Sequence, residues 1–515
     1  MRIDGLALEL QPLSGAVPAV IARVDASQWL EAARRVHEQR RRLVALWGSD
    51  RRERGQGFAM HAAYGMSHGL VLVELPLAAK APSYPDLSGL FACADRMQRA
   101  AYDLVGIVAE GAEDRRPWLR HGAWRETEFP LRHDFDRSAA RENVQESYPF
   151  VRVEGDGVHE IPVGPIHAGI IEPGHFRFSI VGEKVLRLEE RLGYTHKGID
   201  KRFESFDIAE GYRLAGRISG DSTVAYAWAY AQAAEGLLAA VPPPRARWMR
   251  ALMLERERVA NHLGDLGALG NDAAFAFAFA QFMRIKEDVL RLNERIFGHR
   301  FMMDRIVPGG VDARLTAAQA EAMMREADDV EAETDELRRI FDDHAGLQDR
   351  FLTTGRVTPD LARALGLCGL AGRASGQAHD LRADLPCEPY DTLEVKKAVL
   401  HAGDVAARAN VRFEELRESL RLIRTILVEM PDGESRVELP RANAGARGVG
   451  WIEGWRGDVF VALEAGENAR IRRCHAHDCS WQNWPVLQHA IMGNIVPDFP
   501  LINKSFNLSY SGHDS

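Results

Sequence analysis

Two kinds of hydrophobic spacing divide the chain. Residues 43–47, 58–64 and 69–75 are short apolar runs separated by glycine and charged turns, which is typical of strands. A stretch with apolar residues at helical spacing follows at 87–104. The pattern therefore predicts a small α+β domain, and we place it at residues 1–135.

Beyond residue 162 the spacing becomes mainly helical. Residues 116–148 show little periodicity and predict an extended connector, whereas 448–465 alternate around glycine and predict a β-hairpin. We expect an α+β protein whose second domain, 136–515, is mainly helical with short β-hairpins. The predicted helices cover 205–238, 245–269, 280–297, 316–343 and 392–428.

Composition changes this picture little. A chain of 515 residues with 46% apolar and 27% charged positions can bury two or more cores. Its formal net charge of -9 argues against a nucleic-acid partner, and the basic run at 40–42 is expected on a solvated helix face. The longest strongly apolar run, 273–282, falls short of the ~20 residues that cross a bilayer. We therefore expect a cytoplasmic protein that reaches a membrane only through partner subunits.

The five cysteines form no CxxC pair, so they predict reduced thiols and no iron-sulfur cluster held by this chain alone. Between Cys474 and Cys479 lie two histidines, residue types that could bind zinc. Their spacing fits no established zinc pattern, and we interpret the segment as a surface loop with two thiols.

Four blocks in order carry a resemblance to a known family. They read GPIH (164–167) with EPGHFR (172–177), RLGYTHKGIDK (191–201), RASG (373–376) with DLR (380–382), and GDVAAR (403–408). These blocks resemble the large-subunit family shared by energy-converting nickel-iron hydrogenases and respiratory NADH-quinone oxidoreductase. The segments YDLVG (102–106) and PLRHDF (130–135) resemble the small subunit that is fused ahead of the large one in the formate-hydrogenlyase type.

The resemblance points to four positions that hold nickel in hydrogenases, where two CxxC pairs supply thiolates. Here these positions are Ser219, Ser222, Ser509 and Gly512. Hydroxyl oxygens are hard donors, poorly suited to a site built from soft thiolates. We therefore expect no metal on this chain and no hydrogen activation.

In the respiratory relatives the same cavity receives a quinone head. By the resemblance, His175 and Asp272 match the histidine and its tuning aspartate, and Glu172 matches a proton-relaying carboxylate, while Gly216 stands where the quinone-binding tyrosine would be. Quinone binding is thus possible. The resemblance also places Arg373, Asp380 and Arg382 along the cavity, where an ion-pair chain could carry protons or a conformational signal. For each of these residues the alternative is a purely structural pair.

These features imply a subunit of a membrane-bound, ion-translocating oxidoreductase complex on the inner face of the cell membrane. The implied partners are a small iron-sulfur subunit and antiporter-like membrane subunits. The alternative is a redox-silent coupling or scaffold subunit of the same kind of complex. Contact with NAD is not expected, because no glycine-rich dinucleotide fingerprint follows a strand. The charged helical segment 255–262 resembles the family helix near the cavity; by itself it predicts a charged amphipathic face with i,i+3 and i,i+4 pairs.

Overall fold

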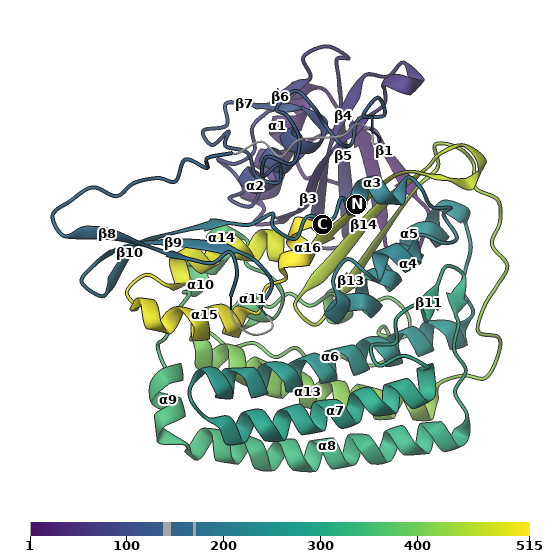
Figure 1. Cartoon of the computed structure of the whole chain (residues 1–515). Helices are drawn as coiled ribbons and strands as arrows, with labels where there is room; N and C mark the ends of the chain where they lie inside the picture. Colours follow the sequence, from purple (N-terminus) through teal and green to yellow (C-terminus); the bar gives the residue numbers. More distant parts are fainter. Residues whose placement is uncertain (1, 137, 139–145, 168–170) are drawn as a thin grey trace.

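The computed structural model describes residues 2–136, 138, 146–167 and 171–515. Figure 1 shows an N-terminal sheet domain at the top, a second sheet in the middle and long helices below. The predicted α+β class is therefore confirmed. Within the described residues, no helix is both long enough and apolar enough to cross a membrane.

The N-terminal domain is built on a five-stranded sheet in the order β1-β2-β5-β4-β3. The predicted strands are confirmed as β3 (Arg42–Asp50), β4 (Phe58–Met66) and β5 (Gly69–Leu77). The predicted helix at 87–104 starts later, as α2 (Ala94–Val105), because Asp86 turns the preceding backbone by accepting the Ser88 amide. The remaining elements are β1 (Leu10–Leu13), β2 (Ala19–Arg23), α1 (Ala26–Glu38), β6 (Ser83–Pro85) and β7 (Val108–Glu110).

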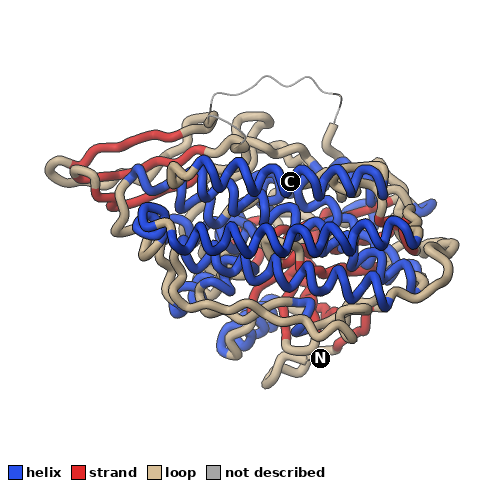
Figure 2. Tube along the Cα trace, turned by 90° about the horizontal axis from the view of Figure 1, so that it is seen from below, coloured by secondary structure: helices blue, strands red, loops and turns tan. Residues whose placement is uncertain are grey.

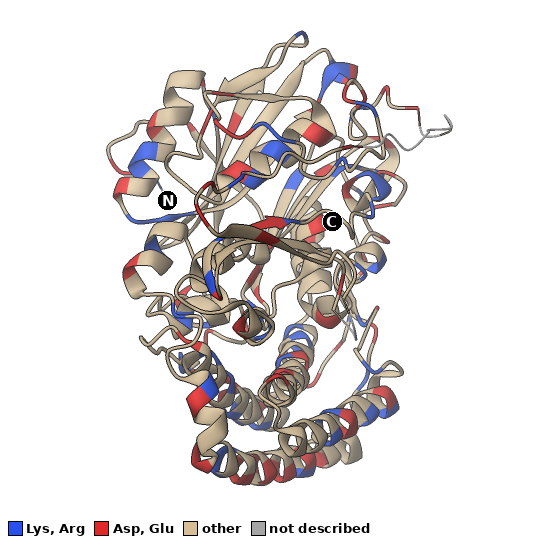
Figure 3. Ribbon diagram, turned by 60° about the vertical axis from the view of Figure 1, so that its left-hand side comes forward, with Lys and Arg blue, Asp and Glu red and all other residues tan. Residues whose placement is uncertain are grey.

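Long helices form the lower layer and lie side by side in Figure 2. Residues 392–404 do not continue the predicted helix upstream, because Asp404 caps the N-terminus of α13 by accepting the Ala407 amide. Charged residues of both signs are frequent along the outer helices (Figure 3), whereas the buried side of α8 carries apolar residues at helical spacing. The four long helices are α6 (Pro244–Asp272), α7 (Ala276–Phe297), α8 (Ala317–Asp343) and α13 (Val405–Glu429).

The middle layer is an antiparallel sheet of three strands covered by helix α5 (Thr223–Leu238). The predicted hairpin is confirmed as β13 (Arg447–Glu453) and β14 (Asp458–Ala465), and β15 (Ile471–Asp478) pairs with β14. A continuous helix over 205–238 is wrong. The chain forms only α4 (Tyr212–Ala215) and a short 3-10 turn, Gly220–Ser222, before α5 begins.

Shorter elements connect these layers. A three-stranded sheet of β8 (Val158–Val163), β9 (His175–Val181) and β10 (Lys184–Arg191) extends from one side of the molecule (Figure 1). The short helices are α3 (Ile199–Phe203), α9 (Ala345–Phe351), α10 (Pro359–Leu365), α11 (Gly369–Ala374), α12 (Leu381–Asp384), α14 (Ser480–Ala490), α15 (Phe499–Phe506) and α16 (Tyr510–Asp514).

The N-terminal domain joins the middle sheet through an apolar cluster that includes Trp47, Trp451 and Phe460. Beside this cluster, Arg42 makes a bidentate ion pair with Asp458, with nitrogen-to-oxygen distances of 3.1 and 2.7 Å. The expectation of a solvated helix face at 40–42 is thus wrong, because Arg42 opens strand β3 and its charge is paired across the domain junction.

Helix α5 lies unusually close to β13 because β13 carries glycine at two alternate positions. A Cβ at Gly448 would lie 1.9 Å from the carbonyl oxygen of Ala233, and one at Gly450 would lie 1.8 Å from that of Ala229. The obstacle in both cases is backbone, so only movement of the helix could make room.

We predict that Gly450→Ala destabilises the folded protein by about 3 kcal/mol, the range expected for overpacking a core. Gly89→Ala is the matched control, because a Cβ there meets nothing within 4 Å. Chemical denaturation of both variants measures the difference. Equal midpoints for Gly450→Ala and Gly89→Ala would contradict the close packing described.

Candidate functional site

The four positions matched to nickel ligands meet in space although they are distant in sequence. Ser219 and Ser222 lie on the turn that leads into α5, and Ser509 and Gly512 lie at helix α16. The hydroxyl oxygens of Ser219 and Ser509 are 3.0 Å apart, and the Gly512 amide donates to the Ser509 hydroxyl at 2.8 Å. The resemblance therefore identified residues that form one site.

An arginine from the β13–β14 turn occupies this site. The Arg456 guanidinium donates from Nη1 to Asp221 Oδ1 at 2.9 Å and to the Ser222 hydroxyl at 3.1 Å. Asp221 also accepts the Ser219 hydroxyl at 2.7 Å. A positive charge and its carboxylate partner thus lie among the serines.

The residues present do not fit a nickel centre. A Cβ at Gly512 would lie 2.8 Å from both Asp478 Oδ2 and the Ser509 hydroxyl, so a cysteine there would have to displace its neighbours. The available donors are hydroxyl and carboxylate oxygens, and the guanidinium of Arg456 repels a cation. That the chain binds no nickel stays a prediction.

One other group in the described part of the chain has metal-ligand types close together, namely Asp50, His133 and Asp134. Arg52 forms ion pairs with both of these carboxylates. Because the guanidinium already neutralises them, this group is better explained as an ion-pair cluster than as a metal site.

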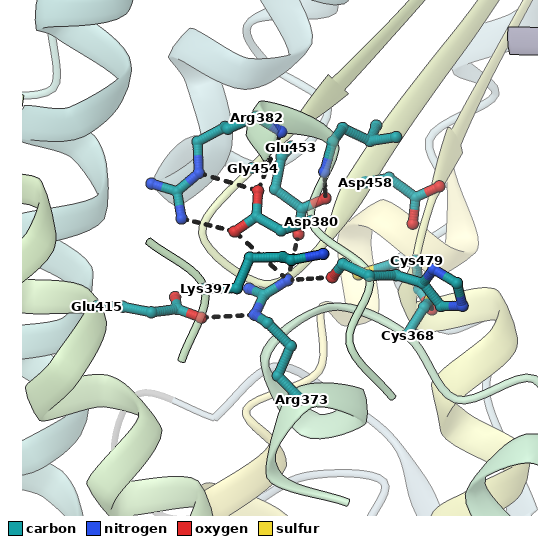
Figure 4. Close-up of polar contacts among 12 residues, drawn as sticks. Cys368, Arg373, Asp380, Arg382, Lys397, Glu415, Glu453, Gly454, Asp458 and Cys479 are labelled. Atoms are coloured by element: carbon teal, nitrogen blue, oxygen red, sulfur yellow. Dashed lines mark hydrogen bonds and ion pairs between the residues drawn. The ribbon is translucent and has the colours of Figure 1, made fainter. Parts of the chain in front are cut away.

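A network of buried charged side chains, drawn in part in Figure 4, lies next to the β13–β14 turn that carries Arg456. Arg258 of this network donates to the carbonyl oxygens of Glu453 and Gly454, at 2.8 and 3.0 Å. Arg373 contacts Glu415 at 2.7 Å and Glu453 at 2.8 Å. Arg382 bridges Asp380 at 2.7 Å and Glu255 at 3.0 Å. The structure therefore brings together Arg373, Asp380 and Arg382, which the sequence grouped, and adds three carboxylates and Arg258, which lies 3.4 Å from Glu255 and 3.7 Å from Glu415.

The network contains more carboxylates than guanidinium groups. Its four carboxyl groups are Glu255, Asp380, Glu415 and Glu453, and its three guanidinium groups are Arg258, Arg373 and Arg382. Burial raises the pKa of Glu453 to about 7, only partly offset by Arg373. For Asp380, burial is outweighed by Arg382 and Arg373, which lower its pKa. Glu453 is thus the member that holds a proton near neutral pH.

Neighbouring buried groups extend this polar region along helix α6. His262 Nε2 lies 2.9 Å from Glu415, and burial lowers the His262 pKa although Glu415 opposes the shift. Glu257 accepts the Val224 and Ala225 amides at the start of α5 at 2.7 and 3.2 Å, and burial raises its pKa to about 8.

The i,i+3 pairing predicted for 255–262 is confirmed, because Arg258 lies 3.4 Å from Glu255, but both side chains are fully buried and do not form a charged amphipathic surface. The available signal was the neighbouring sequence: apolar residues at 252–254 and 259–260 surround the charges and leave no polar face. Sequence reasoning also missed Asp221 and Arg456. They form an ion pair because the fold brings the β13–β14 turn next to the serine positions.

The predicted catalytic residues lie in separate surroundings. Glu172 Oε2 accepts the Ser511 amide at 3.2 Å, which places it beside the serine positions. His175 lies on β9, with Nδ1 3.2 Å from the Gly164 carbonyl oxygen and its ring against Phe150. Asp272 ends α6, where burial raises its pKa and Lys504 opposes the shift.

No hydrogen bond or ion pair joins His175 to Asp272 in the described ranges of the structure, so their shared role stays a prediction. At the tyrosine position of the respiratory relatives, a Cβ on Gly216 would meet the Thr223 hydroxyl at 2.8 Å. A side chain at residue 216 therefore has little room.

The segment 474–479 is not a surface loop. Cys474 is buried within strand β15, and Cys479 is a buried residue that precedes helix α14. His475 and His477 point to separate partners, Asp200 and Gln482. Alternation along β15 places Cys474 on the opposite face from His475 and His477, and Cys479 lies beyond the end of the strand.

Comparison with known proteins identifies families and a solved structure that resemble this chain. A family model of the respiratory-chain NADH dehydrogenase 30 kDa subunit matches residues 22–141, and that of the 49 kDa subunit matches 269–449. The solved structure of an archaeal respiratory membrane complex, the membrane-bound sulfane sulfur reductase, has a chain with the same fold (TM-score 0.66, 23% identity). The match covers 70% of this chain and 99% of that one.

The fold and the matched segments together show one chain in which a part similar to the 30 kDa subunit is followed by a part similar to the 49 kDa subunit. Formate hydrogenlyase subunit 5 of Escherichia coli (strain K12) is 30% identical over 484 residues, covering 92% of this chain and 84% of the relative. An NADH-quinone oxidoreductase protein of Phocaeicola vulgatus is 26% identical over 448 residues, 82% of this chain and 85% of the relative. The chain belongs to the family of hydrogenase and NADH-quinone oxidoreductase large subunits.

We predict that Arg373→Met destabilises the protein by about 3–5 kcal/mol, because it removes the buried guanidinium group that Glu415 and Glu453 share. Arg363→Met serves as the control, since Arg363 pairs with the exposed Asp360 and should change stability by less than about 0.5 kcal/mol. Urea unfolding curves measure both. Similar losses in the two variants would contradict the assigned network.

A second prediction concerns pH. Because folding raises the pKa of Glu257 from its ordinary value of 4.5 to about 8, its contribution to stability is present below about pH 4.5 and is lost as pH rises to 8. Glu257→Gln removes this loss. The melting temperature of the variant, relative to the natural protein, should therefore increase from pH 5 to pH 8 and then level off. Parallel melting temperatures across that range would exclude the raised pKa.

Proposed function

We propose that this chain is the large subunit of a membrane-bound, ion-translocating redox complex of the respiratory type, and that it works without nickel. The observation that carries the proposal is the buried network of four carboxylates and three guanidinium groups, which contains a proton-binding member at neutral pH. Such a network gains or loses a proton when the charge nearby changes.

The chemistry assigned to the chain is proton binding, not electron transfer. An iron-sulfur cluster in a small partner subunit supplies one-electron chemistry when it is present. Glu453 takes up a proton when negative charge is added nearby, because its neutral form is favoured by burial and its anionic form mainly by Arg373. When Glu453 is neutral, Arg373 keeps its contact with Glu415.

The proposed partners follow from the family. Relatives include a formate hydrogenlyase subunit, and a chain of the same fold comes from a respiratory membrane complex. We therefore place the chain on the inner face of the cell membrane, between a small iron-sulfur subunit and antiporter-like membrane subunits. Quinone reduction is left out of the proposal, because the crowded Gly216 cannot supply the tyrosine of the respiratory relatives.

The assembly is tested by tagging the chain, solubilising membranes gently and identifying the co-purified subunits by mass spectrometry. We expect an iron-sulfur subunit and antiporter-like membrane proteins. Recovery of the chain alone, from membranes in which a tagged membrane subunit is intact, would contradict the proposal.

Proton coupling is tested in the purified complex by redox titration of the partner's cluster. Between pH 7 and 8 we expect the midpoint potential to fall with pH, by at most about 59 mV per unit, the limit for one proton per electron. Glu453→Gln should flatten this slope, whereas Glu467→Gln, at an exposed turn, should preserve it. A flat slope in the natural protein would instead favour a redox-silent coupling role.

A further inference from the structure

A cavity of about 300 Å³ lies at the junction between the N-terminal domain and the rest of the chain. Arg41 and Arg42 line one side, and Glu453 of the charge network lines another. Cys368 and Gly369, just before helix α11, also belong to its wall. Cys368 thus borders this cavity, although the residue itself is buried.

Cys368 is close to a second cysteine, 111 residues further along the chain. The Cys368 sulfur lies 4.0 Å from the Cys479 carbonyl oxygen and 3.6 Å from the Asn483 side-chain oxygen, and the Cys368 thiol is close enough to raise the pKa of the Cys479 thiol. Figure 4 draws the two side chains beside each other, next to Asp458. A disulfide requires two sulfur atoms to approach to about 2.05 Å, and the closeness of the Cys368 sulfur to the Cys479 backbone makes these two cysteines the candidate pair.

Asn483 fixes the two cysteines relative to each other. Its side-chain carbonyl oxygen accepts the Cys368 amide at 3.0 Å, and its side-chain nitrogen donates to the Cys368 carbonyl oxygen at 3.2 Å. Because the backbone amide of Asn483 also donates to the Cys479 carbonyl oxygen at the start of helix α14, one residue connects the backbone of both cysteines. The thiols are therefore positioned by a rigid support.

We propose that Cys368 and Cys479 are an oxidisable dithiol that a small peroxide, entering through the interdomain cavity, converts to a disulfide. The Cys368 sulfur attacks one peroxide oxygen, the O–O bond breaks, and the products are a sulfenic acid and water. The Cys479 sulfur then attacks the Cys368 sulfur, and the S–O bond breaks with release of a second water. Two thiols and one hydrogen peroxide give one disulfide and two waters.

Burial decides which oxidation product forms. The contact with Cys368 and burial both raise the pKa of the Cys479 thiol, so neither factor favours a lone reactive thiolate. A disulfide is uncharged and leaves no buried anion, whereas a sulfinic acid would place a new charge beside Asp458. The disulfide is therefore the favoured product, and a dithiol reductant of small size can reverse it.

The location gives the disulfide a mechanical consequence. Cys368 directly precedes helix α11, which carries Arg373 of the network, and Cys479 follows Asp478, which lies at the serine site beside Gly512. A bond between the two cysteines would tie the network to the C-terminal site.

The test uses the full chain in its native state. It is exposed to hydrogen peroxide, denatured with an alkylating reagent and digested for mass spectrometry. We expect the loss of two of the five thiols and a cross-linked peptide pair that contains Cys368 and Cys479. A reducing agent should cleave the cross-link and restore both thiols. Cys387→Ser should leave the cross-link unchanged, and Cys479→Ser should abolish it.

Two outcomes would overturn the proposal. One is full alkylation of Cys368 and Cys479 at peroxide concentrations that oxidise the partly exposed Cys387. The other is a disulfide between Cys368 and Cys93, a buried cysteine whose pKa is raised by burial and by the nearby Cys368 thiol. Both readouts come from the natural chain, so they do not depend on whether a variant folds.

Discussion

The structure depends on burying charged groups in matched sets. Arg373 reaches Glu415 and Glu453, and these contacts join helix α11, helix α13 and the β13–β14 hairpin. A buried charge without a partner costs several kcal/mol, so each side chain is stable only while the others hold their positions. The layers of the fold are thereby fixed to one another by electrostatics as well as by apolar packing.

The same constraint explains the serine site. The positions matched to the nickel-binding thiolates of hydrogenases carry hydroxyl groups here. The polar groups around them therefore need other charged partners. Arg456 and Asp221 supply a paired cation and anion, and the serines complete their hydrogen bonds. Nearby, burial raises the pKa of Glu453 in the charge network to about 7, and the neighbouring carboxylates Asp380 and Asp458 contribute to the increase. The serine site and a proton-binding network are thus neighbours in one polar core.

Local patterns predicted much of the fold. Three of the five strands of the N-terminal sheet, the β13–β14 hairpin and four long helices follow from the spacing of apolar residues. The break at residues 216–222 could not be predicted this way, because helical spacing continues through it and the turn is stabilised by distant Arg456. The burial of the charged residues in α6 was missed for a related reason: the partners of Glu255 and Glu257, which are Arg382 and the Val224 amide, come from elsewhere in the chain.

The site was predicted in part. Motif matching found the serine positions and the Arg373, Asp380 and Arg382 group, which the fold brings together. Its assignment of a shared role to His175 and Asp272 stays a prediction, because the contacts described for the two residues are with other groups. The most direct test of the account is the metal content of the complex purified from cells grown with nickel. The account predicts no nickel above background, whereas stoichiometric nickel bound to this chain would contradict it.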